Sequence, residues 1–219
     1  MTRGARASRA TVLKTATLKW FDSIVLGQKL CPFAPPVRHP PKLSICISNA
    51  TDDEEVLHHV MQEADQIVKG ISSSTTANGT ASGLNGKCPE TSLVVMDPAL
   101  HPSLLCFRTF VQLSWRIQSE GILHRNYQDL LQIVLFHPRA VHDTYQSLSS
   151  EDDEAGGDVA NYTIRSPFPT IHLLRQDQVM SAVDGPYQDL EGLPARNKAK
   201  LRKEGMEVWK ARLKACYEE

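Results

Sequence analysis

The sequence lacks the features that mark several large classes of protein. Its 219 residues include 24 lysines and arginines against 25 aspartates and glutamates, so no charge excess favours non-specific binding to nucleic acid. No uncharged apolar run approaches the roughly 18 residues that span a bilayer. With 41% hydrophobic residues, the chain is too apolar for wholesale disorder. We therefore expect a soluble globular protein that has neither nucleic acid nor a membrane as its partner.

The cysteines also lack a recognisable pattern. There are five, an odd number, and no two form a Cys-x-x-Cys pair, which argues against a disulfide framework and against a zinc ribbon. The first 21 residues contain five basic residues and no acid, in a setting rich in Ser, Thr and Ala. A mitochondrial transit peptide has this composition, and so does a basic tail before a helix. We expect a cytoplasmic protein, with a mitochondrial location as the alternative.

Apolar periodicity predicts that helices and strands alternate along the chain. This alternation is typical of an α/β or α+β fold, here a compact single domain with a small three- to four-stranded sheet packed by helices. The most apolar of the strands is predicted to be buried on both faces. Helices are expected at 11–27, 51–70 (with a capping box formed by Thr51 and Glu54) and 102–120, and strands at 43–47, 92–96, 130–136 (the most apolar) and 171–174.

The same patterns divide the chain into parts. We expect a basic N-terminal tail at 1–11, one domain at 12–205 and a C-terminal helical extension at 206–219. Residues 71–90 consist mostly of Ser, Thr, Gly, Asn and Ala, a composition that predicts a flexible insertion within the domain. Residues 149–158 hold five acids and two glycines, which predicts an exposed loop.

Candidate functional residues concentrate in three segments. The chain has no Walker loop and no GxGxxG, HExxH or GxSxG motif, so no reaction is named by a common signature. Polar residues instead follow predicted elements at Leu30–Ala34, at Phe136–Pro138, and at Asn161–Pro169 with His172 and Arg175 after it. Loops at strand ends commonly carry functional groups on a rigid scaffold. These segments are therefore the candidate site.

Three residues of these segments are candidates for catalysis. Cys31 could act as a nucleophile, although a small buried side chain beside a turn is the favoured interpretation. His137 could be a base or a metal ligand, or it could cap its own turn. His172 alternates with Ile171 and Leu173, so it faces either a site or solvent. His101 lies beside a polar helix surface and is expected to be inert.

The stretch from Asn161 to Pro169 predicts a different kind of chemistry. Prolines spaced by one residue hold an extended backbone, and Arg165 and Ser166 stand at its head. A guanidinium in a rigid loop can hold a carboxylate or a phosphate through paired hydrogen bonds. The alternative is that Arg165 and Arg175 bridge acids or carbonyls within the fold.

These motifs give the chain a resemblance to a known family. Its ordered motifs resemble those of the family called domain of unknown function 1415, over about residues 12 to 205. The chain departs from the family pattern in the insertion at 71–90, at Ile164 and at its ends. The resemblance implies a fold unit and a set of residues that meet in one pocket, but no reaction. The matching residues are Trp20, Leu30–Ala34, Phe136–Pro138, Asn161, Arg165–Pro167, Pro169, His172–Arg175, Pro194 and Asn197.

Three functions remain in competition. The leading hypothesis is a small-molecule enzyme or binder whose anionic ligand is held by Arg165 and Arg175, with Asn161 and Ser166 orienting it. In this scheme His137 or His172 moves a proton. The second hypothesis is a metal site formed by His137, His172 and Cys31. The third is a non-catalytic interaction module that uses the basic C-terminal helix.

Overall fold

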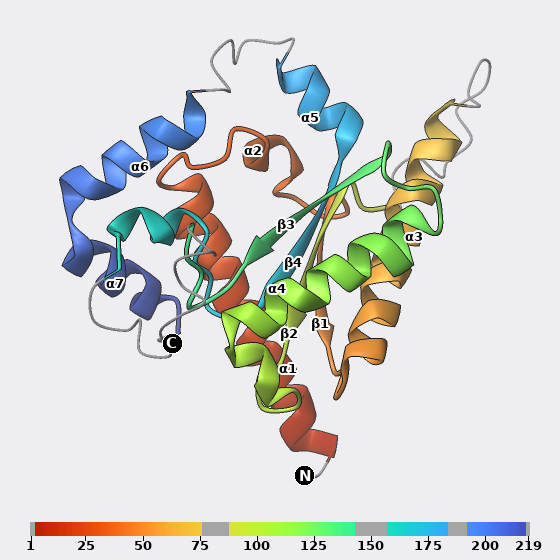
Figure 1. The fold of residues 1–219 in the computed structure, drawn as a ribbon, viewed down its shortest axis with the longest axis horizontal. Coiled ribbons are helices and arrows are strands. Elements are labelled where there is room, and N and C mark those ends of the chain that lie inside the picture. The colour runs from red at the N-terminus through yellow and green to blue at the C-terminus, as the bar shows by residue number, and fades with distance from the viewer. Residues whose placement is uncertain (1–2, 76–87, 143–156, 184–191, 218–219) are drawn as a thin grey trace.

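A mixed sheet lies at the centre of the molecule (Figure 1). The computed structural model describes residues 3–75, 88–142, 157–183 and 192–217. The strands are ordered first, second, fourth, third; the first two are parallel, and the fourth is antiparallel to both of its neighbours. This arrangement confirms a small sheet packed by helices and makes the fold α+β. The strands are β1 (Leu43–Ser48), β2 (Thr91–Met96), β3 (Leu131–Phe136) and β4 (Thr170–Arg175).

Helices pack on both faces of this sheet. No helix within the described ranges is both long and apolar enough to cross a membrane. The α-helices are α1 (Arg3–Trp20), α2 (Ala34–Val37), α3 (Asp53–Thr75), α4 (Phe107–Arg116), α5 (Gln176–Val183), α6 (Leu193–Glu204) and α7 (Met206–Ala215), and the π- and 3₁₀-helical segments are η1 (Phe21–Leu26), η2 (Pro102–Leu105), η3 (Ile117–Leu123) and η5 (Val159–Thr163).

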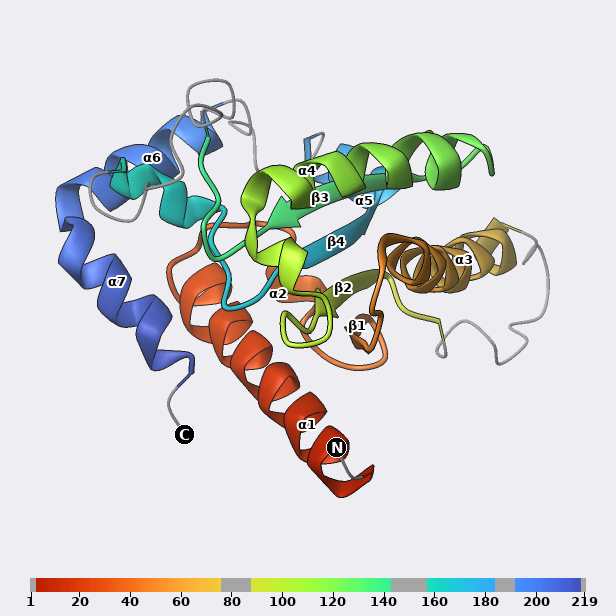
Figure 2. The same cartoon turned by 60° about the horizontal axis from the view of Figure 1, so that its bottom comes forward.

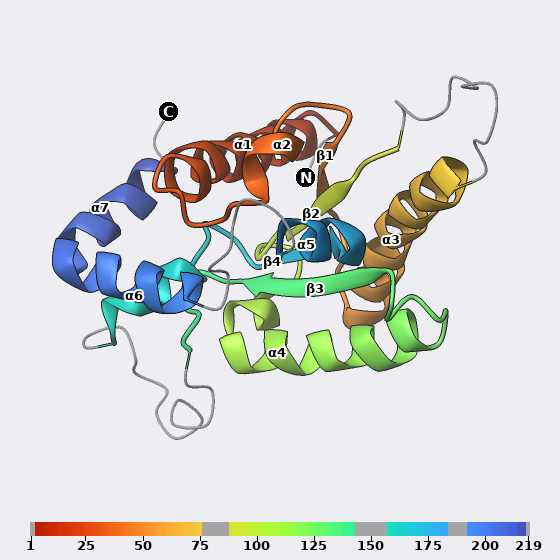
Figure 3. The same cartoon turned by 90° about the horizontal axis from the view of Figure 1, so that it is seen from above.

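Helices flank both faces of the sheet (Figures 2 and 3), and a hydrophobic core lies on each face. The first core lies under α3 and α4 and includes Phe110. The second core lies under α1 and α7 and includes Trp20 and Trp209. Side chains alternate along β4, so Ile171 enters the first core and His172 faces the second.

Three strands end at the same edge of the sheet. β1, β2 and β3 run in one direction, because β1 is parallel to β2 and both β2 and β3 are antiparallel to β4. Their last residues, Ser48, Met96 and Phe136, therefore lie at the edge where β4 begins with Thr170. We call this the carboxyl edge, and loops at such an edge are a common place for ligand sites.

The burial of the strands differs from the prediction. The apolar run at 130–136 forms β3, an edge strand in which only Leu131 is buried, so the expected burial on both faces is wrong. β2 is buried along its whole length. β4, predicted as a short last strand, lies between β2 and β3. Hydrophobicity shows which residues can be buried. Whether a strand lies at the centre or the edge of the sheet depends instead on pairing between strands that are far apart in the sequence.

The start of α3 is close to its prediction. The Oδ1 of Asp52 accepts a hydrogen bond from the N–H of Glu55 at 2.9 Å, and the Glu55 carboxylate accepts one from the N–H of Thr51 at 2.8 Å. The cap is thus shifted by one residue from the predicted pair of Thr51 and Glu54, with the same chemistry. Three acids in the first turn also suit the positive end of the helix dipole.

Both ends of the chain take part in the fold. α1 begins at Arg3, inside the expected tail at 1–11, and the Arg9 guanidinium forms two hydrogen bonds of 2.5 and 2.6 Å with the Asp97 carboxylate. Burial alone would raise the pKa of Asp97, but this pairing lowers it. At the other end, the expected extension at 206–219 contains α7, whose Trp209 is fully buried in the second core.

Two predicted loops lie mostly outside the described residues. α3 continues to Thr75, so the insertion expected at 71–90 cannot begin before that residue, and residues 76–87 are not described. Of the acidic loop expected at 149–158, only the last two residues are described.

Candidate functional site

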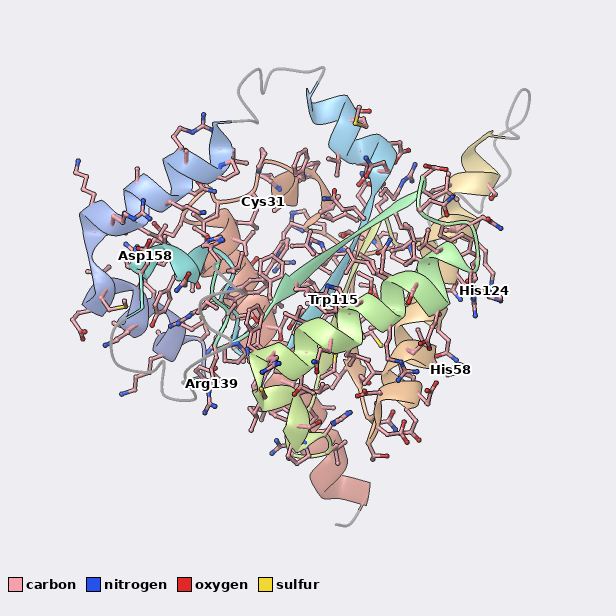
Figure 4. All side chains as sticks on the ribbon, viewed as in Figure 1. Cys31, His58, Trp115, His124, Arg139 and Asp158 are labelled. Carbon is pink, nitrogen blue, oxygen red and sulfur yellow. The ribbon has the colours of Figure 1, made fainter. Side chains whose placement is uncertain are left out.

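Two of the three predicted segments meet at the carboxyl edge. The N–H of His137 donates to the carbonyl of Ile164 at 3.2 Å, which joins the loop after β3 to the loop before β4. The N–H of Met96 donates to the carbonyl of Pro169 at 2.9 Å, which adds the end of β2. The third segment lies elsewhere: Figure 4 shows Cys31 toward α2 and well away from Arg139, which follows β3.

His137 is enclosed and fully hydrogen-bonded. Its Nε2 donates to the carbonyl of Leu104 at 2.8 Å, and its Nδ1 accepts from the N–H of Arg139 at 3.0 Å. The ring lies between Phe107 and Phe110, with centroids 5.3 and 5.5 Å away. Burial lowers the pKa of His137 to about 4, so the ring is neutral at pH 7. Both nitrogens are engaged, which favours the interpretation that His137 caps its own turn and holds α4 to β3.

His172 is enclosed on the opposite face of the sheet. The hydroxyl of Thr91 donates its proton to the carbonyl of Leu173 at 2.7 Å. The oxygen of this hydroxyl therefore accepts the hydrogen bond from Nε2 of His172, also at 2.7 Å. The ring centroid lies 6.1 Å from that of Phe136. Burial lowers the pKa of His172 to about 4. The imidazole thus faces the second core rather than solvent.

The three predicted metal ligands do not come together in the described residues. His137 packs against α4 and His172 faces the second core, so the two rings lie on different sides of the sheet. Within the described residues, no group of three His, Cys, Asp or Glu side chains could hold a metal ion. Cys31 packs against the second core, and burial raises the pKa of its thiol, although the N–H groups of Phe33 and Ala34 act in the opposite direction.

Asn161 and Ser166 hold the loop before β4 in place. The Oδ1 of Asn161 accepts from the N–H of His142 at 3.0 Å. The hydroxyl of Ser166 donates to the carbonyl of Phe168 at 2.6 Å. Both side chains are buried. Their bonds to the main chain position the loop that carries Arg165.

Arg165 has hydrogen-bonding capacity left. Its Nε donates to the carbonyl of Ala140 at 3.2 Å, and its guanidinium carbon lies 4.7 Å from the ring centre of Tyr162. The carbonyl of Arg165 accepts from Nε1 of Trp20 at 2.9 Å. In the described part of the chain, its two terminal nitrogens have no hydrogen-bond acceptor. The side chain is half-buried.

Arg175 is placed and paired differently. It ends β4 at the edge opposite Thr170, five residues and about 17 Å away at the usual rise of a strand. Its guanidinium binds the carboxylate of Asp177 through two contacts, of 3.0 and 2.5 Å. This separation does not support the prediction that Arg165 and Arg175 hold one small anion together, because the two guanidinium groups lie at opposite edges of the sheet.

His142, which the sequence did not identify as a candidate, contacts the loop before β4. Its Nε2 lies 2.7 Å from Oγ1 of Thr163 and 3.2 Å from the carbonyl of Ala160. Burial lowers the pKa of His142, and the charge of Lys198 lowers it further. No motif surrounds His142 in the sequence, so only its place five residues after His137 could have pointed to it.

A hollow on the surface lies at the N-terminal end of α3. A depression of about 520 Å³ follows the first turns of α3. None of the predicted site residues lines it. Its lining residues are Asn49, Thr51, Glu54, Glu55, His58 and His59.

Some basic residues of the C-terminal helices, which the third hypothesis uses, are engaged within the fold. Arg202 pairs with Asp158, and Arg212 pairs with Glu204. Lys200 donates to the carbonyl of Gln28 at 2.7 Å. These pairs leave less basic surface for a partner than the sequence suggested, and an interaction module stays a prediction.

Comparison with known proteins places the chain in a family. The family model described as protein of unknown function (DUF1415) matches residues 12–211. No curated protein and no solved structure matches the chain. Because the match covers most of the sequence, the chain belongs to this family.

Proposed function

We propose that this member of the DUF1415 family binds a small anionic molecule, a carboxylate or a phosphate, at Arg165. The observation that carries the proposal is the way its guanidinium is held. One nitrogen is fixed on Ala140 and the plane rests against Tyr162, while both terminal nitrogens lack an acceptor among the described residues. A guanidinium that is already ordered loses little entropy when it forms paired hydrogen bonds with an anion.

The surrounding loop supports the same function. Pro167 and Pro169 restrict the backbone after Arg165, and the carbonyls on either side of Ser166 are held by Trp20 and by Tyr217. A loop fixed in this way keeps the guanidinium in one position, which is what selective binding of a small anion requires.

The electrostatic field supports an anion rather than a cation. Burial is the main cause of the lowered pKa of His137 and of His142, and nearby cations lower both further: Arg139 and Arg165 at His137, and Lys198 and Arg202 at His142. Asp158 opposes them at His142. Among the described residues, the charges that act on these two histidines are therefore mostly positive, and a positive field raises the local concentration of anions.

A thermal-shift titration with phosphate and with citrate, at constant ionic strength, tests the proposal. Ligand at ten times its dissociation constant should stabilise the protein by about 1.4 kcal/mol. Arg165→Ala should abolish this stabilisation. Arg175→Ala is the matched control, because it removes an arginine whose guanidinium is already paired with Asp177. The proposal fails if neither anion stabilises the protein, or if Arg165→Ala responds as the wild type does.

A further inference from the structure

A second cluster at the carboxyl edge contains a serine, a histidine and an aspartate in hydrogen-bonded order. Asp53 opens α3 after β1, while His101 and Ser103 follow β2, at the start of η2. The Oγ of Ser103 lies 2.9 Å from Nδ1 of His101, and Nε2 of the same ring lies 3.0 Å from Oδ1 of Asp53. None of these three residues belongs to a predicted site or to a family motif.

The direction of the hydrogen bonds follows from the groups themselves. The Asp53 carboxylate can only accept, so Nε2 of a neutral His101 carries the proton and donates it. Nδ1 then has a free lone pair, and the hydroxyl of Ser103 donates to it. A hydroxyl bonded to an imidazole whose far side is held by a carboxylate is the arrangement that activates a serine as a nucleophile.

The exposure of the three groups suits that chemistry. Ser103 is exposed and can meet a substrate, whereas the His101 side chain is only 11% exposed. The backbone is fixed on both sides of the ring, because the N–H of His101 donates to Asp97 and its carbonyl accepts from Leu104. On the far side of the Asp53 carboxylate, Oδ2 lies 3.9 Å from Nη1 of Arg116. The base is therefore sheltered and oriented while the nucleophile is open.

We propose that Ser103, His101 and Asp53 form an acyl-transfer site that hydrolyses small carboxylic esters. Ser103 Oγ bonds to the ester carbonyl carbon while its proton passes to Nδ1 of His101. The intermediate expels the alcohol, which takes that proton, and the acyl group stays on Ser103. Water then attacks the acyl carbon and gives a proton to His101, which returns it to Ser103 as the carboxylic acid leaves. The site does not depend on anion binding at Arg165.

Labelling with a fluorophosphonate, which reacts with activated serines, tests the site directly. The full-length protein is incubated with the reagent and the modified residue is identified by peptide mass spectrometry. We expect phosphonylation at Ser103. His101→Gln should slow the labelling by on the order of 100-fold, because the general base is lost. Asp53→Asn should also slow it, because an amide no longer selects the reactive tautomer. Thermal unfolding of each variant checks that it folds.

Two controls separate an activated serine from background reactivity. Ser119→Ala removes another exposed serine, whose hydroxyl donates to the carbonyl of Trp115, and should leave the labelling unchanged. Hydrolysis of p-nitrophenyl acetate is measured in a Cys106→Ala background, because Cys106 is an exposed thiol close to Ser103. In that background, Ser103→Ala should reduce the rate of p-nitrophenyl acetate hydrolysis to the rate in buffer without protein. Labelling absent from Ser103 in the wild type, or unaffected by His101→Gln, would overturn the proposal.

Discussion

The two faces of the sheet are covered by different kinds of side chain. The first core, under α3 and α4, is largely aliphatic, and its buried imidazole, His137, closes the end next to Leu104. The second core, under α1 and α7, is rich in aromatic rings, and Trp20 connects it to the loop before β4 through the carbonyl of Arg165. The second face thus positions the candidate anion site in addition to packing, whereas the first face packs α3 and α4 and carries the Ser103, His101 and Asp53 cluster. Disturbing one core or the other should separate these two roles.

The largest expected effect comes from truncating one aromatic ring on each face. Trp20→Ala and Phe110→Ala each remove a ring that is almost completely buried, and each should lower the free energy of unfolding by about 3–5 kcal/mol. Only Trp20→Ala also releases the carbonyl of Arg165. Urea unfolding measures the first effect, and phosphate binding to the folded variants measures the second. If Phe110→Ala weakened phosphate binding as much as Trp20→Ala, the division between the faces would fail.

The two buried histidines should make the protein sensitive to acid on both faces. His137 and His172 have a pKa of about 4 in the fold, below the usual 6.5, so the unfolded chain binds more protons between these values. Stability is therefore complete above pH 6.5 and falls as the pH drops toward 4. Each histidine should contribute a loss of about 2 kcal/mol between pH 7.5 and pH 5.

Single variants assign this loss to one face or the other. His137→Gln and His172→Gln should each reduce the proton uptake on unfolding at pH 5 by about one, measured as the slope of unfolding free energy against pH. Asp and Glu residues titrate mostly below pH 5, so they contribute little to the slope of unfolding free energy against pH in this range. A variant that keeps the wild-type slope would show that its histidine is not a buried neutral group.

Much of the fold could be predicted from local patterns. Helix periodicity and the acids before α3 identify elements, because they depend on residues close in sequence. The order of the strands depends on pairing between distant segments, so the central place of β4 and the edge position of β3 could not be foreseen. For the same reason the packing of α7 could not be predicted. Trp209 indicates in the sequence that one side of this helix is buried, but the sequence does not show which surface it packs against.

The candidate site was less predictable than the fold. The sequence shows that Asn161, Ser166 and His137 are polar and close to strand ends, but not that their polar atoms bond to nearby main chain. Arg165 and Arg175 are alike in sequence, and only the strand between them shows that they lie at opposite edges. His101 and Asp53 are separated by 48 residues and become neighbours because β1 and β2 are parallel.

The smallest expected effect comes from a pair of tyrosines, one on each face. Tyr217 donates to the carbonyl of Pro167 at 2.6 Å, and Tyr127 donates to the carboxylate of Asp65 at 3.0 Å. Replacing either with Phe should lower the free energy of unfolding by about 1 kcal/mol, the usual value of one hydrogen bond. Asp65 keeps its pairing with Arg125, which limits the second loss. Tyr217→Phe should also weaken phosphate binding, because the loop after Arg165 loses a support, whereas Tyr127→Phe should not. Equal phosphate affinity in the two variants would show that Tyr217 contributes to stability without positioning Arg165.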